Sequence, residues 1–377
     1  MNDFSSSKKI EGTNDKNISL VSSSALSSQK LRILMVSSEY PPINGGVGRY
    51  TYNLVKELKR QGLEVHVACD SRGNGDYTDL SPNNTHNSEI LLDLVNKIKP
   101  DIVHIQYEPG LYGLKLHLYR PYKIRTTIDS FYAKSTIPIV TTFHSEYNFR
   151  QWMKIPQIKI NKEKSLSISK KSADDKKYKL LSGLKDVLYS VNIYWKYLIN
   201  YEAFQNQNKE KLLRSNYGIV FSNYMKSIIG AKRSSGEHTS KVRLLYHGAE
   251  PAYSVTGISK EIARARFSSL PKDKKCRIAL AFGFMTVSKG WDILGKMRIL
   301  DNWTIVINSS VNHSTGERIR LDNLKYTENN NNANAIINLN HDYLSEEDLS
   351  ALFFASDVVL LPYKITSGSG VMFDALA

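Results

Sequence analysis

The stretch 38-SEYPPINGGVGRYTYNLVKEL-58 decides the fold, because it joins a short apolar run to a helical pattern through a glycine-rich loop. The run before it, 31-LRILMV-36, is typical of a buried strand. The loop holds Gly45, Gly46 and Gly48, and apolar residues then recur at helical spacing. A strand, a loop and a helix in this order begin an α/β sheet that binds ligands at the carboxyl ends of its strands.

Three interpretations of this loop stay open from its residues. A dinucleotide fingerprint needs G-x-G-x-x-G close behind the strand, and Asp70 lies where its ribose-binding acid is expected. However, the third glycine position is Thr51, and the glycines follow the strand only after a long excursion that Pro41 and Pro42 stiffen. A long loop with a glycine tip favours close approach of the backbone to an anionic ligand or a sugar. The third interpretation is a plain structural turn.

The rest of the chain repeats the same alternation of short apolar runs and helical patterns. We expect a first set of strands at 31–36, 64–69, 101–106, 138–143, 217–222 and 242–247, and a second at 277–283, 303–308, 335–340 and 357–362. A surface helix at 257–270 separates the two sets. Nearly continuous apolar strands between helices indicate parallel sheets covered on both faces. The sequence therefore predicts an α/β protein with two doubly wound, Rossmann-like domains that face each other across a cleft.

Composition limits the class of protein. The chain has 377 residues, 41% of them hydrophobic, and a net charge of +15, which favours phosphorylated substrates, a membrane surface or nucleic acid as partners. Two cysteines, Cys69 and Cys276, cannot build a disulfide framework, so a cytoplasmic location is expected. Residues 1–30 are rich in Ser, Asn and Lys, and we expect a disordered tail.

Seven segments, in order along the chain, resemble the motifs of family 4 retaining glycosyltransferases of the GT-B fold. The first is the loop E-Y-P-P-x-x-G-G-V-G-R-Y of the opening stretch. The others are 100-PDIVHIQYEPG-110, 138-PIVTTFHSEY-147, 220-VFSNYMKSII-229, 246-YHGAEPAY-253, 282-FGFMTVSKGWDILGKM-297 and 357-DVVLLPYKITSGSGVMFDALA-377. The resemblance implies an acceptor-side domain at 31–250 and a nucleotide-sugar-binding domain at 251–377.

The resemblance also implies the reaction and its residues. A sugar passes from a UDP-sugar or GDP-sugar to a glycan, a lipid or another hydroxyl acceptor, and the anomeric configuration is retained. The catalytic candidates are His144, which would meet the transferred sugar, and Lys289, which would pair with the diphosphate. The backbone amides of Ser369, Gly370 and Val371 would hold a phosphate at the start of the last helix. Asp374 would hold the ribose hydroxyls, and Gly45 and Gly46 would approach the donor phosphates or the acceptor from the opposite domain.

Three features depart from the family pattern. The arginine that normally follows the glycine of the phosphate loop is Phe284, so one cation of the diphosphate site is missing. The first acid of the family's pair falls on Ser367, which can accept a hydrogen bond from a sugar hydroxyl but carries no charge. The chain stops at Ala377, inside the last predicted helix, and we expect a truncated second domain. Candidates for the missing cation are Arg49, Arg277 and Lys364.

A basic insertion at about 150–215 stands out, with 15 Lys or Arg against 6 Asp or Glu. Within it, 188-LYSVNIYWKYLINYEAF-204 places six aromatic residues at helical spacing. One interpretation is a helix beside the cleft whose aromatic residues face the core. The other is an amphipathic cationic surface at the inner face of an anionic membrane, which suits a membrane-borne acceptor and cell-envelope glycan synthesis.

The sequence thus predicts a glycosyltransferase that needs no cofactor. No Cys/His spacing and no Asp-x-Asp at a strand end suggests a metal site, and no motif suggests nucleic-acid binding. Two alternatives stay open: a catalytically silent nucleotide-sugar-binding homologue that acts as a partner subunit, and a sugar-nucleotide epimerase of the same fold. The substitutions at Phe284 and Ser367 favour the silent homologue.

Overall fold

The structure is a computed structural model. It describes residues 30–120, 124–160, 176–230, 240–248, 259–284, 286–310, 336–339 and 343–377. The predicted tail at 1–30 lies almost entirely outside these residues, as do parts of 150–215 and 246–253.

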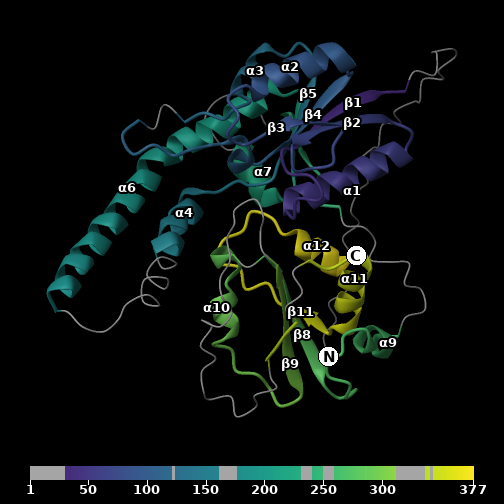
Figure 1. Cartoon of the computed structure of the whole chain (residues 1–377), viewed down its shortest axis with the longest axis vertical. Coiled ribbons are helices and arrows are strands. Elements are labelled where there is room, and N and C mark those ends of the chain that lie inside the picture. Colours follow the sequence, from purple (N-terminus) through teal and green to yellow (C-terminus); the bar gives the residue numbers. More distant parts are fainter. Residues whose placement is uncertain are drawn as a thin grey trace, which may run out of the picture. The chain divides into compact units, whose positions relative to one another are not determined.

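The first half of the described chain builds one sheet whose strands all run parallel, in the order β3-β2-β1-β4-β5-β6-β7 (Figure 1). Its strands are β1 Arg32–Val36, β2 Glu64–Asp70, β3 Tyr77–Leu80, β4 Ile102–Tyr107, β5 Ile139–Phe143, β6 Tyr217–Val220 and β7 Val242–Leu244. Its helices are α1 Gly46–Arg60, α2 Asn87–Ile98, η1 Pro109–Tyr112, α3 Asp129–Lys134, α4 Phe149–Trp152, α6 Lys176–Arg214 and α7 Asn223–Gly230.

The central strand β1 explains why helices cover both faces of this sheet. Alternate residues of a strand point to opposite faces, and here both faces are apolar. Leu34 and Val36 pack into a core cluster with residues of α2 and α3. Ile33 and Met35 pack on the other face, with Val55 of α1. A strand buried on both sides needs a continuous apolar run, as 31–36 predicts.

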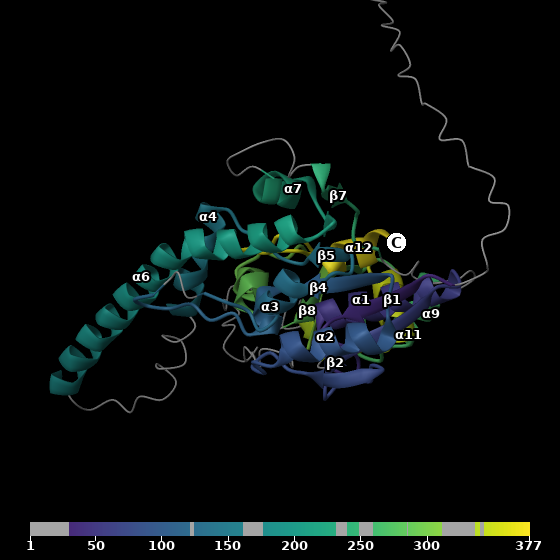
Figure 2. The same cartoon turned by 90° about the horizontal axis from the view of Figure 1, so that it is seen from above.

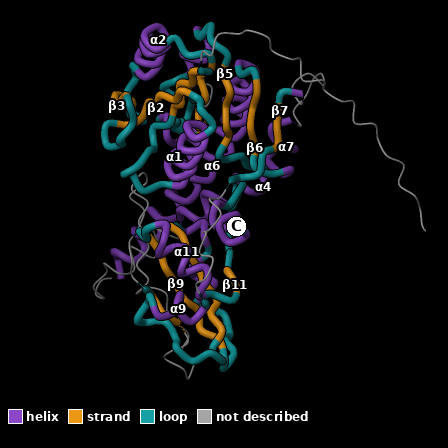
Figure 3. Tube along the Cα trace, turned by 90° about the vertical axis from the view of Figure 1, so that its right-hand side faces the viewer, coloured by secondary structure: helices purple, strands orange, loops and turns teal. Residues whose placement is uncertain are grey.

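The second half builds a smaller parallel sheet in the order β10-β9-β8-β11 (Figure 3). Its strands are β8 Arg277–Phe284, β9 Trp303–Ser310, β10 Ile336–Asn338 and β11 Val358–Val359. Its helices are α9 Lys260–Ala265, η3 Val287–Lys289, α10 Trp291–Leu294, α11 Glu346–Ala355 and α12 Gly370–Leu376. Ile278 and Leu280 of β8 pack with α9 and α11, whereas Ala279 and Ala281 pack with α10 on the other face.

Every strand predicted from the sequence is present, within a few residues of the expected bounds. One strand was missed: β3 has the sequence YTDL and pairs only with β2 at the edge of the sheet, so it carries no apolar run. The predicted surface helix at 257–270 is shorter, because α9 begins behind the N-cap Ser259, whose side chain accepts a hydrogen bond from the Ile262 amide. The two sheets have separate cores, while the exact domain bounds remain predictions.

The long helix α6 contains the aromatic stretch 188–204 and extends well beyond the sheet at its N-terminal end (Figure 2). Some aromatic residues of that stretch face the core and others are exposed, so each of the two interpretations describes part of it. Tyr197 and Phe204 are buried against Trp152, whereas Tyr194 and Trp195 are 38% and 51% exposed. Within the described ranges, no helix combines the length and the apolar character that a membrane crossing requires.

Candidate functional site

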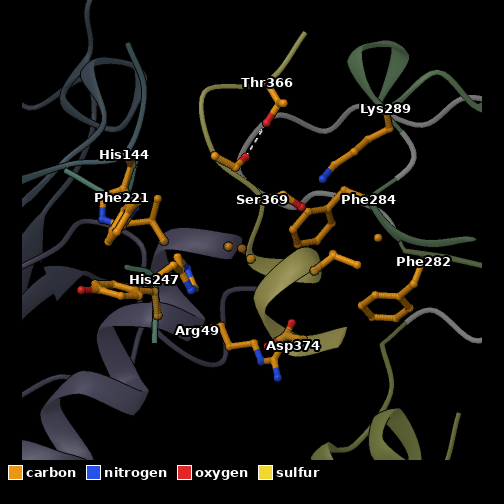
Figure 4. A pocket seen from close by; sticks show the side chains of 18 of the residues that line it. Arg49, His144, Phe221, His247, Phe282, Phe284, Lys289, Thr366, Ser369 and Asp374 are labelled. Carbon is orange, nitrogen blue, oxygen red and sulfur yellow. Dashed lines mark hydrogen bonds and ion pairs between the residues drawn. The ribbon is translucent and has the colours of Figure 1, made fainter. Parts of the chain in front are cut away.

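One cavity of about 340 Å³ lies between the carboxyl ends of the two sheets, with residues of both in its wall. Figure 4 shows His144, Phe221 and His247 on one side of it and Lys289, Phe284 and Ser369 on the other. Its lining includes all the residues that the resemblance implies for catalysis and donor binding: Gly45, Gly46, His144, Lys289, Ser367, Ser369, Gly370, Val371 and Asp374.

The loop that opens the sequence analysis forms the N-terminus of α1 inside this wall. Glu39 is buried, and one of its carboxylate oxygens accepts a hydrogen bond of 3.0 Å from the Gly48 amide. This acid compensates the positive end of the α1 dipole, since the first turn of the helix contains no acid of its own. A Cβ at Gly45 would lie 1.8 Å from the Glu39 carboxyl carbon, so any larger residue there has to displace this carboxylate. Gly46, by contrast, has nothing within 4 Å of the position of a Cβ.

The structure does not support Asp70 as the ribose-binding acid of a dinucleotide site. The Asp70 carboxylate is 3% exposed and is bonded to Arg72 at 2.7 Å. Asp70 is not part of the cavity wall. The loop therefore faces the cavity without the ribose contact that a dinucleotide site of this type uses.

His144 follows β5 directly, so its side chain lies at the carboxyl edge of the sheet. Its Nε2 lies 2.9 Å from Oε1 of Gln106. A carbonyl oxygen can only accept, so Nε2 carries the proton and Nδ1 keeps its lone pair. Burial, with smaller effects of His247 and His104, lowers the pKa of His144 to about 3. The imidazole is therefore neutral at physiological pH and can accept a hydrogen bond from a hydroxyl.

Aromatic rings hold this histidine in place. The ring of Tyr50 lies 5.3 Å from that of His144, 5.1 Å from Phe221 and 4.8 Å from His247, measured between centroids. His247 also stacks on Phe373 of α12 at 5.7 Å. The cluster therefore connects α1, the strand ends of the first sheet and the last helix.

Lys289 ends the short helix η3, and its amino group points toward the loop that carries Ser369 (Figure 4). Its Nζ donates a hydrogen bond of 2.8 Å to the Tyr363 hydroxyl, which lies 3.0 Å from Oγ of Ser369. A Cβ at Gly283 would lie 3.9 Å from Nζ, and Gly283 has φ +131, so glycine is required beside the lysine. The Lys289 ammonium thus lies at the start of α12, as a diphosphate partner would.

The loop before α12 has contacts with the first half of the chain. Ser369 is the N-cap of α12, and its Oγ accepts a hydrogen bond from the Met372 amide. The Ser367 hydroxyl donates to the His144 carbonyl at 3.4 Å, and the Ser367 carbonyl accepts from Ser222 at the same distance. Ser367 therefore joins the two halves of the cavity wall at the position of the family's first acid.

Asp374 takes part in an ion-pair network that the sequence does not suggest. Nη1 of Arg49 lies 2.8 Å from its carboxylate, and the same guanidinium forms two hydrogen bonds with Glu346, of 2.9 and 2.8 Å. Burial opposes the charge of Arg49, but the two carboxylates raise its pKa above the ordinary value. The predicted ribose-binding acid is therefore paired with an arginine of α1.

The same network bears on the cation that Phe284 replaces. Of the three candidates, only Arg49 lines the cavity. Arg277 begins β8, at the opposite end of that strand from Phe284, and lies over the Trp303 ring. Lys364 pairs with Asp292 at 2.6 Å. Arg49 is therefore the candidate that the geometry supports.

The residues of the wall that sequence reasoning missed include Glu108, Glu346 and Tyr363. Glu108 follows β4 inside the motif 100–110, so its position at a strand end of that motif was the available signal. Burial raises the pKa of its carboxyl to about 7, so it titrates near neutrality. In the described part of the chain, no group of three or more His, Cys, Asp or Glu is placed to hold a metal ion.

The fold places the chain among known structures. It matches sucrose-phosphate synthase from Thermosynechococcus elongatus with a TM-score of 0.56 and 13% identity, over 92% of this chain and 79% of that one. It matches HepE from Anabaena, solved in complex with UDP-glucose, with a TM-score of 0.52 and 11% identity, over 92% and 78%. The chain therefore has the GT-B fold, with Rossmann-like halves, as predicted.

A comparison of the sequence with protein-family models identifies a family for part of the chain. Residues 44–174 match the family model described as Glycosyltransferase Family 4. This match supports the resemblance read from the motifs over these residues, and the chain has the GT-B fold with a glycosyltransferase family 4 segment. By sequence alone, no curated protein matches the chain.

Proposed function

We propose that the protein transfers a hexosyl group from a nucleotide diphosphate to a hydroxyl acceptor with retention of configuration. The observation that carries this proposal is the convergence of the predicted residues on one cavity between the two sheets. Residues from all seven motifs line it, and local sequence patterns alone do not require that they meet.

The donor diphosphate would lie at the start of α12, between Lys289 and the cavity-lining segment 369–371. Charge grows on the diphosphate as its bond to the sugar breaks, so a nearby ammonium group stabilises the transition state. Arg49 would supply the second cation in place of the family's arginine. Because it is paired with two carboxylates, the donor has to compete with Asp374 and Glu346 for its guanidinium.

The sugar would lie between this diphosphate site and His144. Nδ1 of the neutral imidazole would accept a hydrogen bond from a sugar hydroxyl, and Asp374 would accept hydrogen bonds from the ribose. In the reaction the acceptor oxygen bonds to the anomeric carbon, and the departing diphosphate takes the electron pair of the broken bond. The acceptor proton passes to the diphosphate.

We also propose a base and a sugar for the donor. The fold relative HepE is solved with UDP-glucose, which makes UDP-glucose the first donor to test, with GDP-sugars next. We further propose a cytoplasmic enzyme of cell-envelope glycan synthesis, peripheral to an anionic membrane. The net charge of +15 and the exposed apolar residues of α6 support this location.

A product assay tests the proposal and separates it from the alternatives. The full chain is incubated with a nucleotide sugar, with and without a lipid or glycan acceptor, and the nucleoside diphosphate and the sugar products are analysed. A transferase releases diphosphate and forms a glycoside in an acceptor-dependent reaction. A silent homologue binds the donor without turnover. The substitutions at Phe284 and Ser367 are the features that favour this alternative. An epimerase converts the donor sugar to its epimer and transfers nothing.

A further inference from the structure

A second cavity, of about 640 Å³, lies against α6 and adjoins the site described above. Three residues line both cavities: Glu108, Ser145 and Tyr147. The two cavities therefore adjoin at these three residues. No role in the proposed reaction has so far been given to this space.

The wall of the second cavity has an aliphatic part and a polar part. Leu114, Leu116, Ile155 and Ile193 contribute aliphatic surface, and the buried Trp152 packs behind them at 3% exposure. Among the described residues of this wall there is no Asn, Gln, Asp or Thr. Apart from the lysines and Trp152, its hydrogen-bonding side chains are one glutamate, one serine and three tyrosines, so the aliphatic part of the wall offers no partner to the hydroxyls of a sugar ring.

Three lysines add positive charge to this wall: Lys115, Lys159 and Lys196. Nζ of Lys159 lies over the Tyr197 ring, 5.3 Å from its centroid. Lys115 and Lys159 are exposed and Lys196 is half-buried, so all three remain accessible to an anion. Apolar surface beside several ammonium groups matches a molecule that has both an apolar chain and an anionic group.

Glu108 lies in the wall where the two cavities meet, beside Ser145, whose buried hydroxyl has no hydrogen-bond partner among the described residues. As a carboxylate, Glu108 can only accept hydrogen bonds. A hydroxyl that points from the second cavity into the first would be a suitable donor to it. Glu108 can thus orient a hydroxyl toward the sugar site.

The outward side of α6 indicates the source of such a molecule. Val187, Leu188, Val191, Trp195 and Leu198 recur at helical spacing and are each between 44% and 63% exposed. They form an apolar row on the helix that also walls the second cavity. An apolar row on a basic segment is suited to the boundary of an anionic membrane.

We propose that the second cavity binds the acceptor, that the acceptor is a lipid with an anionic headgroup, and that Glu108 positions its reacting hydroxyl. This deepens the proposed function and rests on it. The lysines hold the headgroup, and the aliphatic wall holds the first part of the chain. Glu108 is a positioning residue that accepts a hydrogen bond from the acceptor hydroxyl.

Lipid binding is tested first, without any donor. Lysophosphatidylglycerol and lysophosphatidylcholine with the same acyl chain are titrated below their micelle concentrations into the full chain. We expect the anionic lipid to bind at least about 10-fold more tightly than the zwitterionic one. The double substitution Lys159→Glu and Lys196→Glu should weaken its binding roughly 10–100-fold. The control Lys226→Glu, on the exposed side of α7, should change it by less than about 2-fold. Equal affinity for the two lipids, or an unchanged affinity in the double variant, overturns the proposal.

The role of Glu108 is tested by the pH profile of transfer. Because the carboxyl titrates near pH 7, transfer should fall as the pH drops through this range in the wild type. Glu108→Gln should lower transfer and remove this limb of the profile, while its affinity for nucleotide stays unchanged. An unchanged profile in Glu108→Gln rejects the positioning role. If nucleotide does not bind the wild type at all, the proposed function fails instead, and the lipid titration still decides the chemistry of the second cavity.

Discussion

Replacement of Arg49 by methionine tests whether its ion-pair network holds the two halves of the site together. The guanidinium is 20% exposed and contacts Asp374, which is 12% exposed, at 2.8 Å. A charge-assisted hydrogen bond in such a position contributes about 1.5–3 kcal/mol. The contact with Glu346 contributes less, up to about 1 kcal/mol, because that carboxylate is 43% exposed and partly screened by water. The free energy of unfolding should therefore fall by about 2–4 kcal/mol.

Urea denaturation followed by tryptophan fluorescence measures this loss. The matched control is Arg266→Met, since Arg266 also contacts two carboxylates, Asp348 and Glu347, but on an exposed surface. The control should lose less than the test variant. A double-mutant cycle of Arg49→Met with Asp374→Asn isolates the pair, and we expect a coupling energy of about 1.5–3 kcal/mol. A coupling near zero, or equal losses for Arg49 and Arg266, would refute the network.

The pH dependence adds a second check on the same variant. Burial raises the pKa of Asp374, and Arg49 counteracts this effect. Without Arg49 the pKa rises further, so the folded variant binds a proton at a higher pH than the wild type does. The folded state then holds more protons than the unfolded state, and the variant gains stability as the pH falls. The deficit relative to wild type should be largest at neutral pH and should shrink in acid.

Two further predictions concern the first half of the chain. Gly45→Ala should lower the free energy of unfolding by about 1–3 kcal/mol, because the new Cβ displaces the Glu39 carboxylate from the Gly48 amide. Gly46→Ala, at an open position, should cost nothing in the same denaturation experiment, and equal losses would contradict this explanation. Because the folded-state pKa of His144 is lowered to about 3, the unfolded state takes up the proton first, and stability should fall by about 2 kcal/mol between pH 7 and pH 5 from this residue. His144→Gln should show a shallower pH slope by that amount, and identical slopes would show that the histidine is not buried as described.

Much of the fold follows from local patterns. Each apolar run with β-branched residues became a parallel strand, because burial on both faces leaves no room for polar residues in the strand. The strand β3 was not predicted, because an edge strand with the sequence YTDL lacks this apolar pattern. The helix predicted at 257–270 begins later in the structure. The Ser259 cap, and not the apolar spacing, fixes the start of α9.

The sequence predicted many of the residues that line the candidate site, but it did not predict the hydrogen bonds and ion pairs between them. Motif order placed Lys289 and Asp374, but it could not predict that Tyr363 accepts a hydrogen bond from the lysine. Arg49 and Glu346 are 297 residues apart in the sequence, so only the packing of the two halves brings them together. Glu108 lies in the motif 100–110, but the motif assigns it no role, and only the two cavities that share it in their walls show its place.

Calorimetric titration of UDP-glucose and of a GDP-sugar into the full chain tests the central claim most directly, with Lys289→Ala and Lys364→Ala as the paired variants. Lys289 lines the cavity, whereas the neighbouring Lys364 is bonded to Asp292 outside its wall. The account predicts that one donor binds, that Lys289→Ala weakens it by about 1.5–3 kcal/mol, or roughly 10–150-fold, and that Lys364→Ala leaves it unchanged. Equal affinities in wild type and Lys289→Ala would contradict the placement of the diphosphate in this cavity.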